Sequence, residues 1–111
     1  MKHEMRLNQN PFNKIKNGSK TIEIRLYDEK RRLIKVGDII EFTSRETNEK
    51  LSVQVVKLHL FNNFEELYNK FDKILLGYAE NEEASSKDMS IYYSKEEQDK
   101  YGVVGIEIKL I

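Results

Sequence analysis

The sequence has no cysteine and no tryptophan, and it has only one proline and two histidines. Without cysteine the chain can form no disulfide, thiol nucleophile, thiolate zinc site or iron–sulfur cluster. His3 and His59 are too few for a histidine-rich metal centre. We therefore expect neither a bound metal nor a cofactor.

Long apolar runs are also missing. No stretch approaches the roughly 18 apolar residues that a membrane-spanning helix needs. The first ten residues are too polar for a signal peptide. The 111 residues show no linker, internal repeat or second composition, so we expect a single domain over residues 1–111, monomeric, cytoplasmic and away from membranes.

The formal net charge is zero, but the charge is unevenly spread. Residues 1–60 hold 13 Lys and Arg against 8 Asp and Glu, whereas residues 61–111 hold 6 against 11. The first part therefore carries a net charge of +5 and the second −5. This asymmetry predicts a basic face for an anionic ligand. The alternative is that the two parts neutralise each other in the fold.

Alternating and helical patterns follow one another along the chain. Alternation predicts strands near residues 3–7, 21–26, 38–43, 51–60 and 103–110. Asn10 followed by Pro11 predicts a helix start, with Asn10 as N-cap. Apolar residues spaced 3, 4 and 3 apart from Phe64 to Phe71 predict a second helix capped by Asn63. A short helix is expected over 88–93, and Ser94 with Glu97 forms a capping-box pattern for a last one.

This order of elements predicts an α+β fold. Five or six strands around one small core would curl into a β-barrel, which also removes exposed sheet edges. One helix would lie between the first two strands, and short helices would precede the last strand.

The segment from Gly18 to Arg25 carries the strongest functional signal. Thr21, Glu23 and Arg25 share one parity of the expected strand, so they would project from one face, with Lys20 at its entrance. The alternative is an ordinary half-buried strand with a solvated polar face. We expect Lys20 to line a wet cleft, so that its removal hardly affects stability.

Several parts of the chain together resemble the ASCH (activating signal cointegrator homology) family of the PUA-like superfamily. They are Pro11-Phe12, the run from Ile15 to Arg25 with its Gly-x-Lys-Thr-Ile-Glu-x-Arg core, Val36 to Phe42, and Tyr101 to Glu107. The resemblance covers nearly the whole chain. It implies a small PUA-like barrel with a cleft, and RNA or a modified nucleoside as partner.

The resemblance also implies an alternative, enzymatic reading. Some ASCH proteins are amidohydrolases that deacetylate N4-acetylcytidine with a Lys, a Thr and a Glu, and ribonuclease activity is known in the family. Lys20 matches the Lys, whereas Glu23 stands where those members have the Thr, three residues further on. Glu82 is the candidate for the distal Glu. The resulting catalytic set is Lys20, Glu23 and Glu82.

The chemistry of these side chains allows binding, catalysis or a plain ion pair. A lysine acts as base or nucleophile only if burial or a neighbouring cation lowers its pKa, and Glu23 would oppose this. Lys20 is better suited to holding a phosphate or polarising a carbonyl. Glu23 could act as a general base, or it could accept a hydrogen bond from an exocyclic amine. We expect the ligand to contact Lys16, Lys20, Thr21, Glu23 and Arg25. Glu23 with Arg25 as a structural pair is the alternative.

A second basic cluster follows at Lys30, Arg31, Arg32 and Lys35. It predicts contacts to an RNA backbone, with a solvated loop as the alternative. Aromatic side chains offer candidate platforms for a base, although most in so small a domain belong to the core. These candidates are Phe12, Tyr27, Tyr92, Tyr93 and Tyr101.

Overall fold

The computed structural model describes all residues 1–111. The elements in chain order are β1 (Lys2–Leu7), α1 (Gln9–Lys16), β2 (Ile22–Leu26), the 3-10 helix η1 (Arg31–Leu33), β3 (Ile39–Ser44), β4 (Lys50–Phe61), α2 (Phe64–Lys70), the 3-10 helix η2 (Ser86–Ile91), α3 (Lys95–Tyr101) and β5 (Val103–Leu110). The α+β class and the positions of the predicted strands are confirmed. No helix is long and apolar enough to span a membrane.

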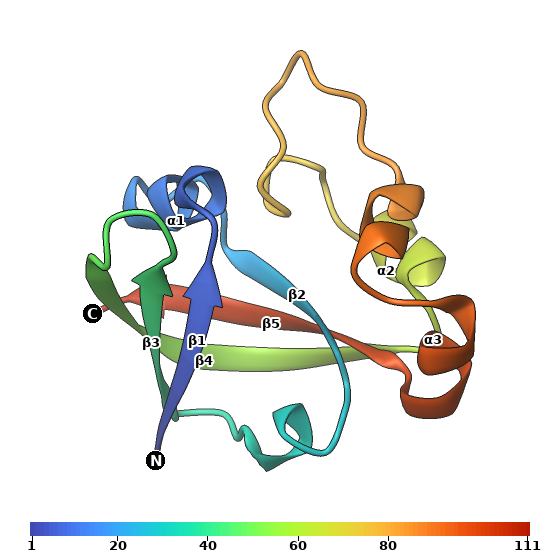
Figure 1. Cartoon of the computed structure of the whole chain (residues 1–111), viewed down its shortest axis with the longest axis horizontal. Helices are drawn as coiled ribbons and strands as arrows, with labels where there is room; N and C mark the ends of the chain where they lie inside the picture. Colours follow the sequence, from blue (N-terminus) through green and yellow to red (C-terminus); the bar gives the residue numbers. More distant parts are fainter.

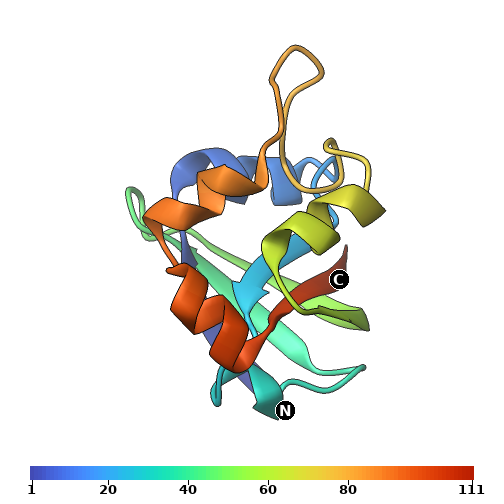
Figure 2. The same ribbon diagram turned by 90° about the vertical axis from the view of Figure 1, so that its right-hand side faces the viewer.

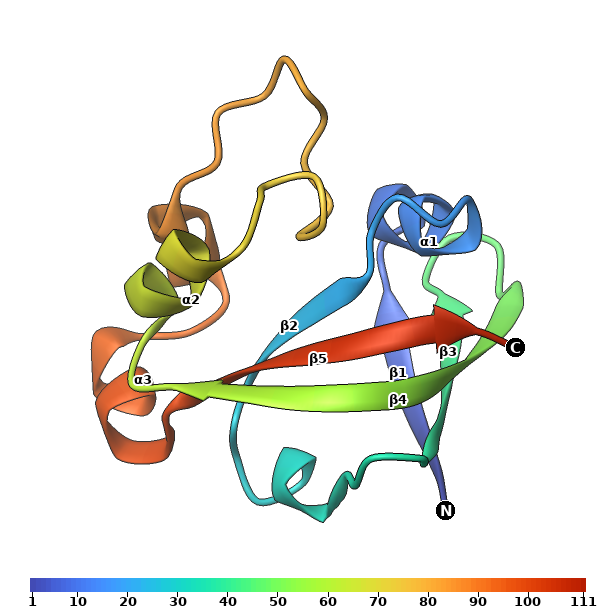
Figure 3. The same cartoon turned by 180° about the vertical axis from the view of Figure 1, so that it is seen from behind.

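The five strands form one curled sheet in the order β1-β3-β4-β5-β2 (Figure 1). β1 runs parallel to β3, and the other neighbours are antiparallel. From behind, the long strands β4 and β5 cross in front of β1 and β3 (Figure 3). The sheet is a half-barrel, because β1 and β2 remain its two edges. The expected closure of the barrel is therefore incomplete, and a seam stays open between these edges.

The inner face of the curl holds the larger core. Phe12 and Ile15 of α1 close one end of this core, and Phe42 and Ile40 of β3 lie at its centre without exposed surface. Burying each such side chain stabilises the fold by roughly 1.5–3 kcal/mol. α1 is thereby fixed over the end of the half-barrel where β2 begins.

A second apolar cluster lies on the outer face of β2 and β5. Ile22 packs there with Phe64 and Leu67 of α2, and the layer of helices covers this side of the sheet (Figure 2). Gly105 of β5 allows the close approach, since a Cβ there would lie 3.1 Å from Ile22 Cγ2. The apolar stripe of Phe64, Leu67 and Phe71 packs in this outer cluster, whereas Ile40, Phe42, Ile106 and Ile108 belong to the inner core. β2 is consequently covered on both faces.

A register shift between Val55 and Lys57 interrupts the pairing of β4 with β5. Simple alternation would have put Val53, Val55 and Lys57 on one face. The shift instead leaves Val56 and Lys57 exposed, and Leu58 packs against the inner core. An extra residue in one strand reverses the parity of everything after it.

Two of the three predicted helix caps are confirmed. The Asn63 side chain accepts from the Glu66 amide, and Ser94 with Glu97 forms the full capping box. The prediction of Asn10 as N-cap is wrong, since the helix starts two residues earlier and Asn8 takes the cap position without a side-chain bond. Pro11 then lies in the first turn, where backbone N–H groups have no partner within the helix.

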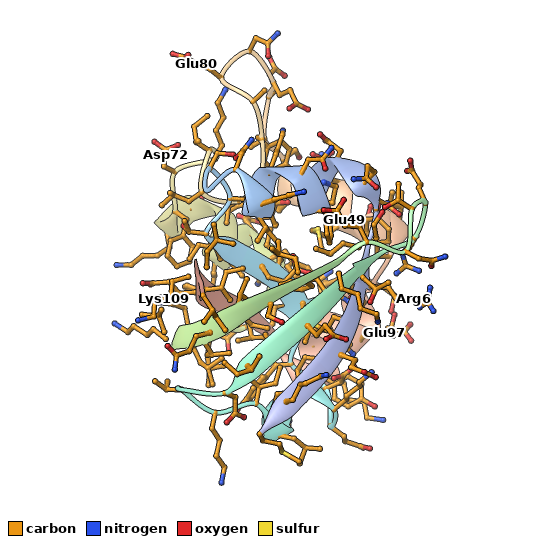
Figure 4. The ribbon with its side chains drawn as sticks, turned by 90° about the vertical axis from the view of Figure 1, so that its left-hand side faces the viewer. Arg6, Glu49, Asp72, Glu80, Glu97 and Lys109 are labelled. Carbon is orange, nitrogen blue, oxygen red and sulfur yellow. The ribbon has the colours of Figure 1, made fainter.

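The loop between α2 and η2 reaches across to the start of β2. Its Leu75 carbonyl accepts from the amides of Thr21 and Ile22, and its Gly77 carbonyl accepts from Lys14 Nζ at 2.6 Å. Gly77 has φ +105°, a backbone conformation that residues with a side chain rarely adopt. The loop rises beside α1 (Figure 1), and Glu80 lies at its tip (Figure 4). These bonds hold the loop over the Gly-x-Lys-Thr-Ile-Glu-x-Arg motif.

Candidate functional site

Lys20, Glu23 and Arg25 meet in one network on the inner face of β2. Lys20 Nζ lies 3.3 Å from Glu23 Oε1, and Arg25 Nε donates to Glu23 Oε2 at 2.8 Å. The Ile24 amide also donates to Glu23 Oε1 at 3.3 Å. One carboxylate therefore faces two cations, and the predicted convergence of these three side chains is present.

Lys20 is held from both sides. Its Nζ donates to the Leu76 carbonyl at 2.9 Å, besides its pairing with Glu23. An ammonium has three protons to donate. Two partners occupy two of them, so the third remains for a group that enters from outside.

Arg25 bridges the open seam of the half-barrel. Its Nη2 donates to the backbone carbonyl of Arg6 at 3.0 Å, so a side chain from edge strand β2 reaches edge strand β1. The ion pair between Glu23 and Arg25, which the sequence offered as the alternative, is present as well. Arg25 therefore belongs both to the charged network and to the contact between the two edges.

Burial and mutual attraction set the protonation of the network. For Glu23, burial would raise the pKa, but Arg25 and Lys20 together hold it below its usual value, so the carboxylate is charged. For Lys20, burial is the largest effect, and it lowers the pKa despite the attraction of Glu23. For Arg25, burial opposes the charge, but Glu23 raises the pKa. A proton leaves Lys20 more easily than an ordinary lysine, while Arg25 continues to balance Glu23.

One alternative and one expectation about this network need correction. Glu23 does not project from a solvated face, because only 4% of its surface is exposed. Lys20 lines a cleft, as expected, but it is not freely hydrated there, since it is 5% exposed. The cause is that α2 covers the apolar face of β2, so the polar side chains of β2 point toward the interior. The loop around Leu76 and Gly77 then covers Lys20.

The network opens onto a cleft of about 670 Å³, called here the central cleft. Its floor is Lys20, Glu23 and Arg25, and one wall carries the aromatic rings of Tyr68, Tyr78, Tyr92 and Tyr93. The other lining residues are Arg6, Leu7, Asn8, Asn10, Pro11, Ile24, Arg45, Leu76, Gly77, Glu82, Asp88, Met89 and Ile91. Charged groups at the base and apolar or aromatic walls are typical of a ligand site.

Three hydroxyl and carboxylate groups form a chain along the aromatic wall. The Tyr68 and Tyr78 hydroxyls lie 2.8 Å apart, and Tyr78 donates to Asp88 at 2.7 Å. Burial first, and then the neighbouring oxygens, raise the pKa of Tyr78. The tyrosines are therefore neutral donors, and the bonds fix the orientation of the wall.

Glu82 lies at the rim of the central cleft, as one of its lining residues. Its Oε1 accepts from the Ala79 amide at 2.7 Å and lies 3.4 Å from Lys14 Nζ. The bond from Ala79 is the main cause of its lowered pKa. The structure therefore places a charged carboxylate in the same cleft as Lys20.

Other predicted ligand residues lie elsewhere. Thr21 precedes β2, and its amide and carbonyl bond with Leu75 and Ile108. Lys16 is exposed and pairs with Glu49. Neither lines the central cleft, and Phe12 is buried in the core. The expectation that Lys16 and Thr21 contact a ligand in this cleft is not supported by their positions.

The second basic cluster divides in the structure. Lys30 and Arg31 line a neighbouring hollow, whereas Arg32 and Lys35 do not. Arg32 lies 4.4 Å above the Tyr27 ring and donates to the Tyr101 carbonyl at 3.1 Å. Of the four residues predicted to contact an RNA backbone, only Lys30 and Arg31 therefore line this hollow.

The neighbouring hollow has a volume of about 630 Å³ and is called here the basic groove. Its lining residues are Glu4, Met5, Arg6, Arg25, Lys30, Arg31, Thr43, Arg45, Asn48 and Lys50. It shares Arg6, Arg25 and Arg45 with the central cleft, so the two hollows adjoin along the seam.

Sequence reasoning missed several cleft residues. Arg6 and Arg45 lie in or beside strands far from the motif, and Tyr68 reads as part of the apolar stripe of α2. The only signal in the sequence was the alternation of apolar Met5, polar Arg6 and apolar Leu7, and any half-exposed strand shows such a pattern. No group of three or more His, Asp or Glu side chains is arranged to hold a metal ion.

Comparisons with known proteins agree with this architecture. The model of the ASCH domain matches residues 5–111. The hypothetical protein PH0355 is 39% identical, with full coverage of both chains and a TM-score of 0.84. A protein from Pyrococcus furiosus, solved by NMR, is 36% identical over all of this chain and 98% of its own, with a TM-score of 0.78.

A more distant structure shows the fold alone. ASCH from Zymomonas mobilis is 12% identical, covers 97% of this chain and 66% of its own, and has a TM-score of 0.70. No curated protein matches the sequence. The family model covers nearly all of the chain, and the fold agrees with it, so the protein belongs to the ASCH family, whose domains are PUA-like.

Proposed function

We propose that this domain binds RNA or a modified nucleoside in the central cleft. The observation that carries the proposal is the buried Lys20–Glu23–Arg25 network at the base of a cleft walled by tyrosines. Buried charges are costly, and a site that recognises polar groups is a reason to keep them. The base of the ligand would stack on the exposed ring of Tyr92, which lines the cleft.

The floor of the cleft offers matched groups to a nucleobase. The remaining proton of Lys20 would bond a carbonyl or phosphate oxygen. Glu23 would accept from an exocyclic amine, as carboxylates do with cytosine. Arg25 holds Glu23 charged for this purpose. Such a site favours a base that presents a carbonyl and an amine side by side.

Calorimetric titration of cytidine, N4-acetylcytidine and a short single-stranded RNA tests the proposal. Tyr92→Ala should weaken binding, because stacking contributes about 1–3 kcal/mol per base. Tyr101→Ala is the matched control, since that ring lies outside the cleft beneath Lys100. Equal loss in both variants, or no binding by the wild type, would contradict the assignment.

The second candidate is a small hydrolase, an amidohydrolase or ribonuclease, that uses Lys20 and Glu23. The observation that favours it is the lowered pKa of Lys20, caused chiefly by burial, beside an Arg25 that still balances Glu23. In the amide reaction Lys20 takes a proton from water, whose oxygen adds to the acetyl carbonyl. The C–N bond then breaks, the proton passes from Lys20 to the leaving nitrogen, and the products are cytidine and acetic acid, which loses its proton to solvent. Glu82 at the rim would orient the water.

Turnover of N4-acetylcytidine and of RNA, followed over time, tests the hydrolase. General acid–base assistance contributes about 100- to 10,000-fold, so Lys20→Met should lose most of the activity. Glu82→Gln should lose less, and Glu80→Gln, from the same loop but outside the cleft, should lose none. If the wild type converts neither substrate faster than Lys20→Met, the hydrolase hypothesis is wrong, and the proposal of a binding domain is unaffected.

We propose further that residues 1–111 act as one monomeric domain in the cytoplasm. Sedimentation of the purified protein and microscopy of a tagged chain in its host cell are the direct tests.

A further inference from the structure

We infer that the basic groove is a second, phosphate-binding subsite, so that the ligand is a single strand of RNA extending beyond the nucleoside in the central cleft. The inference rests on the proposed function and deepens it. It distinguishes an oligonucleotide from a free nucleoside as the natural ligand.

The charge of the basic groove is the first support. Six cationic side chains line it against one carboxylate, and only one of its ten lining residues is apolar. Arg25, Arg31 and Lys50 have ion-pair partners in Glu23, Asp28 and Glu41. Arg6, Lys30 and Arg45 are the remaining cations, and they form no ion pair. The groove therefore presents uncompensated positive charge, which suits the backbone of a nucleic acid.

The position of the groove is the second support. Arg6, Arg25 and Arg45 line both hollows, so a strand that leaves the central cleft across the seam meets cations without a break. The side of the half-barrel that carries β1 and Arg6 is open to solvent (Figure 4). Tyrosines line only the central cleft, and arginines dominate the basic groove. One hollow thus suits a base and the other suits phosphates.

An unbonded donor is the third support. Arg31 Nε is buried in the groove wall and has no hydrogen-bond partner, although its Nη1 pairs with Asp28 at 3.2 Å. Nearly all buried polar atoms in folded proteins have a partner. A phosphate oxygen that draws the Arg31 side chain toward the groove would supply this one.

The test compares two double variants that each remove two positive charges. Lys30→Gln with Lys50→Gln changes two exposed side chains that line the groove and do not line the central cleft. Lys57→Gln with Lys109→Gln is the matched control, from exposed positions on β4 and β5 away from both hollows. Lys109 lies across the molecule from Arg6 (Figure 4). The measured quantities are the affinities for cytidine and for a six-nucleotide single-stranded RNA at several salt concentrations.

The groove variant should bind the RNA about 5- to 20-fold more weakly at low salt, and its log–log salt slope should fall by about 1.4, since each phosphate contact contributes about 0.7. Its affinity for cytidine should stay unchanged. The control should keep the wild-type RNA affinity. A hexaglutamate peptide should not displace the RNA, because it has no base for the central cleft.

Each of the other possible results contradicts one specific part of the proposal. If the groove variant keeps the wild-type RNA affinity and slope, the subsite is wrong and the proposed nucleoside site survives. If both double variants lose affinity equally, only general charge attracts RNA, and the subsite is again wrong. If hexaglutamate displaces RNA, the groove is a site for acidic peptides. If the wild type binds neither cytidine nor RNA, the proposed function fails as well.

Discussion

The two faces of β2 are buried to nearly the same degree but differ in chemistry. Ile22, Ile24 and Leu26 on the outer face are 2%, 7% and 4% exposed, and Glu23 on the inner face is 4% exposed. The outer side chains gain from leaving water. The charged ones lose hydration worth several kcal/mol per ion, which their attraction repays only in good geometry. Burial alone therefore does not indicate a stabilising role, and the buried charges of the inner face call for a functional explanation.

The largest effect is expected from Glu23→Gln. It would leave Lys20 and Arg25 buried without a carboxylate, which costs about 3–5 kcal/mol in free energy of unfolding. Urea unfolding measures this. Glu41→Gln is the matched control, because Glu41 also pairs with two lysines, Lys2 and Lys50, but those are more than half exposed. A similar loss in both variants would show that burial of the network is not the cause.

The outer face should respond almost as strongly. Ile22→Ala removes a side chain that packs against Gly105 and the helix α2, and such truncations cost about 2–5 kcal/mol. Because Ile22 does not line the central cleft, the folded variant should keep its affinity for ligand. Loss of stability and of affinity together would mean that the two faces of β2 are not independent.

Most of the fold could be predicted from local patterns. The stripe from Phe64 to Phe71, the cap at Asn63 and the alternation in the strands act over short distances, so the sequence displays them directly. The register shift at Val56 and the early start of α1 could not be read, because both depend on partners distant in the chain. The edges of the half-barrel depend likewise on how far the sheet curls.

The residues of the charged network could be predicted, but their burial and their neighbours could not. The spacing of Lys20, Glu23 and Arg25 is local, so their convergence could be foreseen. Their burial depends on Leu76 in the loop after α2, more than fifty residues later. Arg6 and Arg45 reach the seam through β1 and the turn after β3, and their own neighbourhoods hold no signal beyond the ordinary strand alternation around Arg6.

Lys20→Met should have a smaller and pH-dependent effect. Its two acceptors lose a donor, which costs about 1–3 kcal/mol near neutral pH. The folded pKa of Lys20 lies below its unfolded value, so above the folded pKa the unfolded chain binds more protons. The wild type should therefore gain stability relative to Lys20→Met as the pH rises toward about 10.5. Parallel curves for the two proteins between pH 7 and 10 would contradict this.

The smallest effect concerns the contact between Gly77 and Lys20. A Cβ at Gly77 would lie 3.0 Å from Lys20 Cδ, whereas one at Gly37 would meet nothing within 4 Å, and both glycines have positive φ near +100°. Gly77→Ala should thus cost up to about 1 kcal/mol more than Gly37→Ala, since a flexible side chain can give way. It should also weaken ligand binding, because Lys20 Nζ shifts. Equal effects of the two substitutions on both properties would show that Lys20 tolerates the added methyl.

The bridge from Arg25 to the Arg6 carbonyl has a thermodynamic consequence. A ligand in the seam would contact both free edges of the sheet, which lie together only in the folded chain. The free energy of binding would therefore stabilise the folded state and not the unfolded one. At a ligand concentration of 100 times Kd this linkage raises the free energy of unfolding by about 2.7 kcal/mol. For a domain of this order of size, each kcal/mol moves the melting temperature by about 4–8 °C. A simple melting curve therefore tests the proposed ligands, because a nucleoside or RNA strand that binds the folded domain should raise its unfolding temperature.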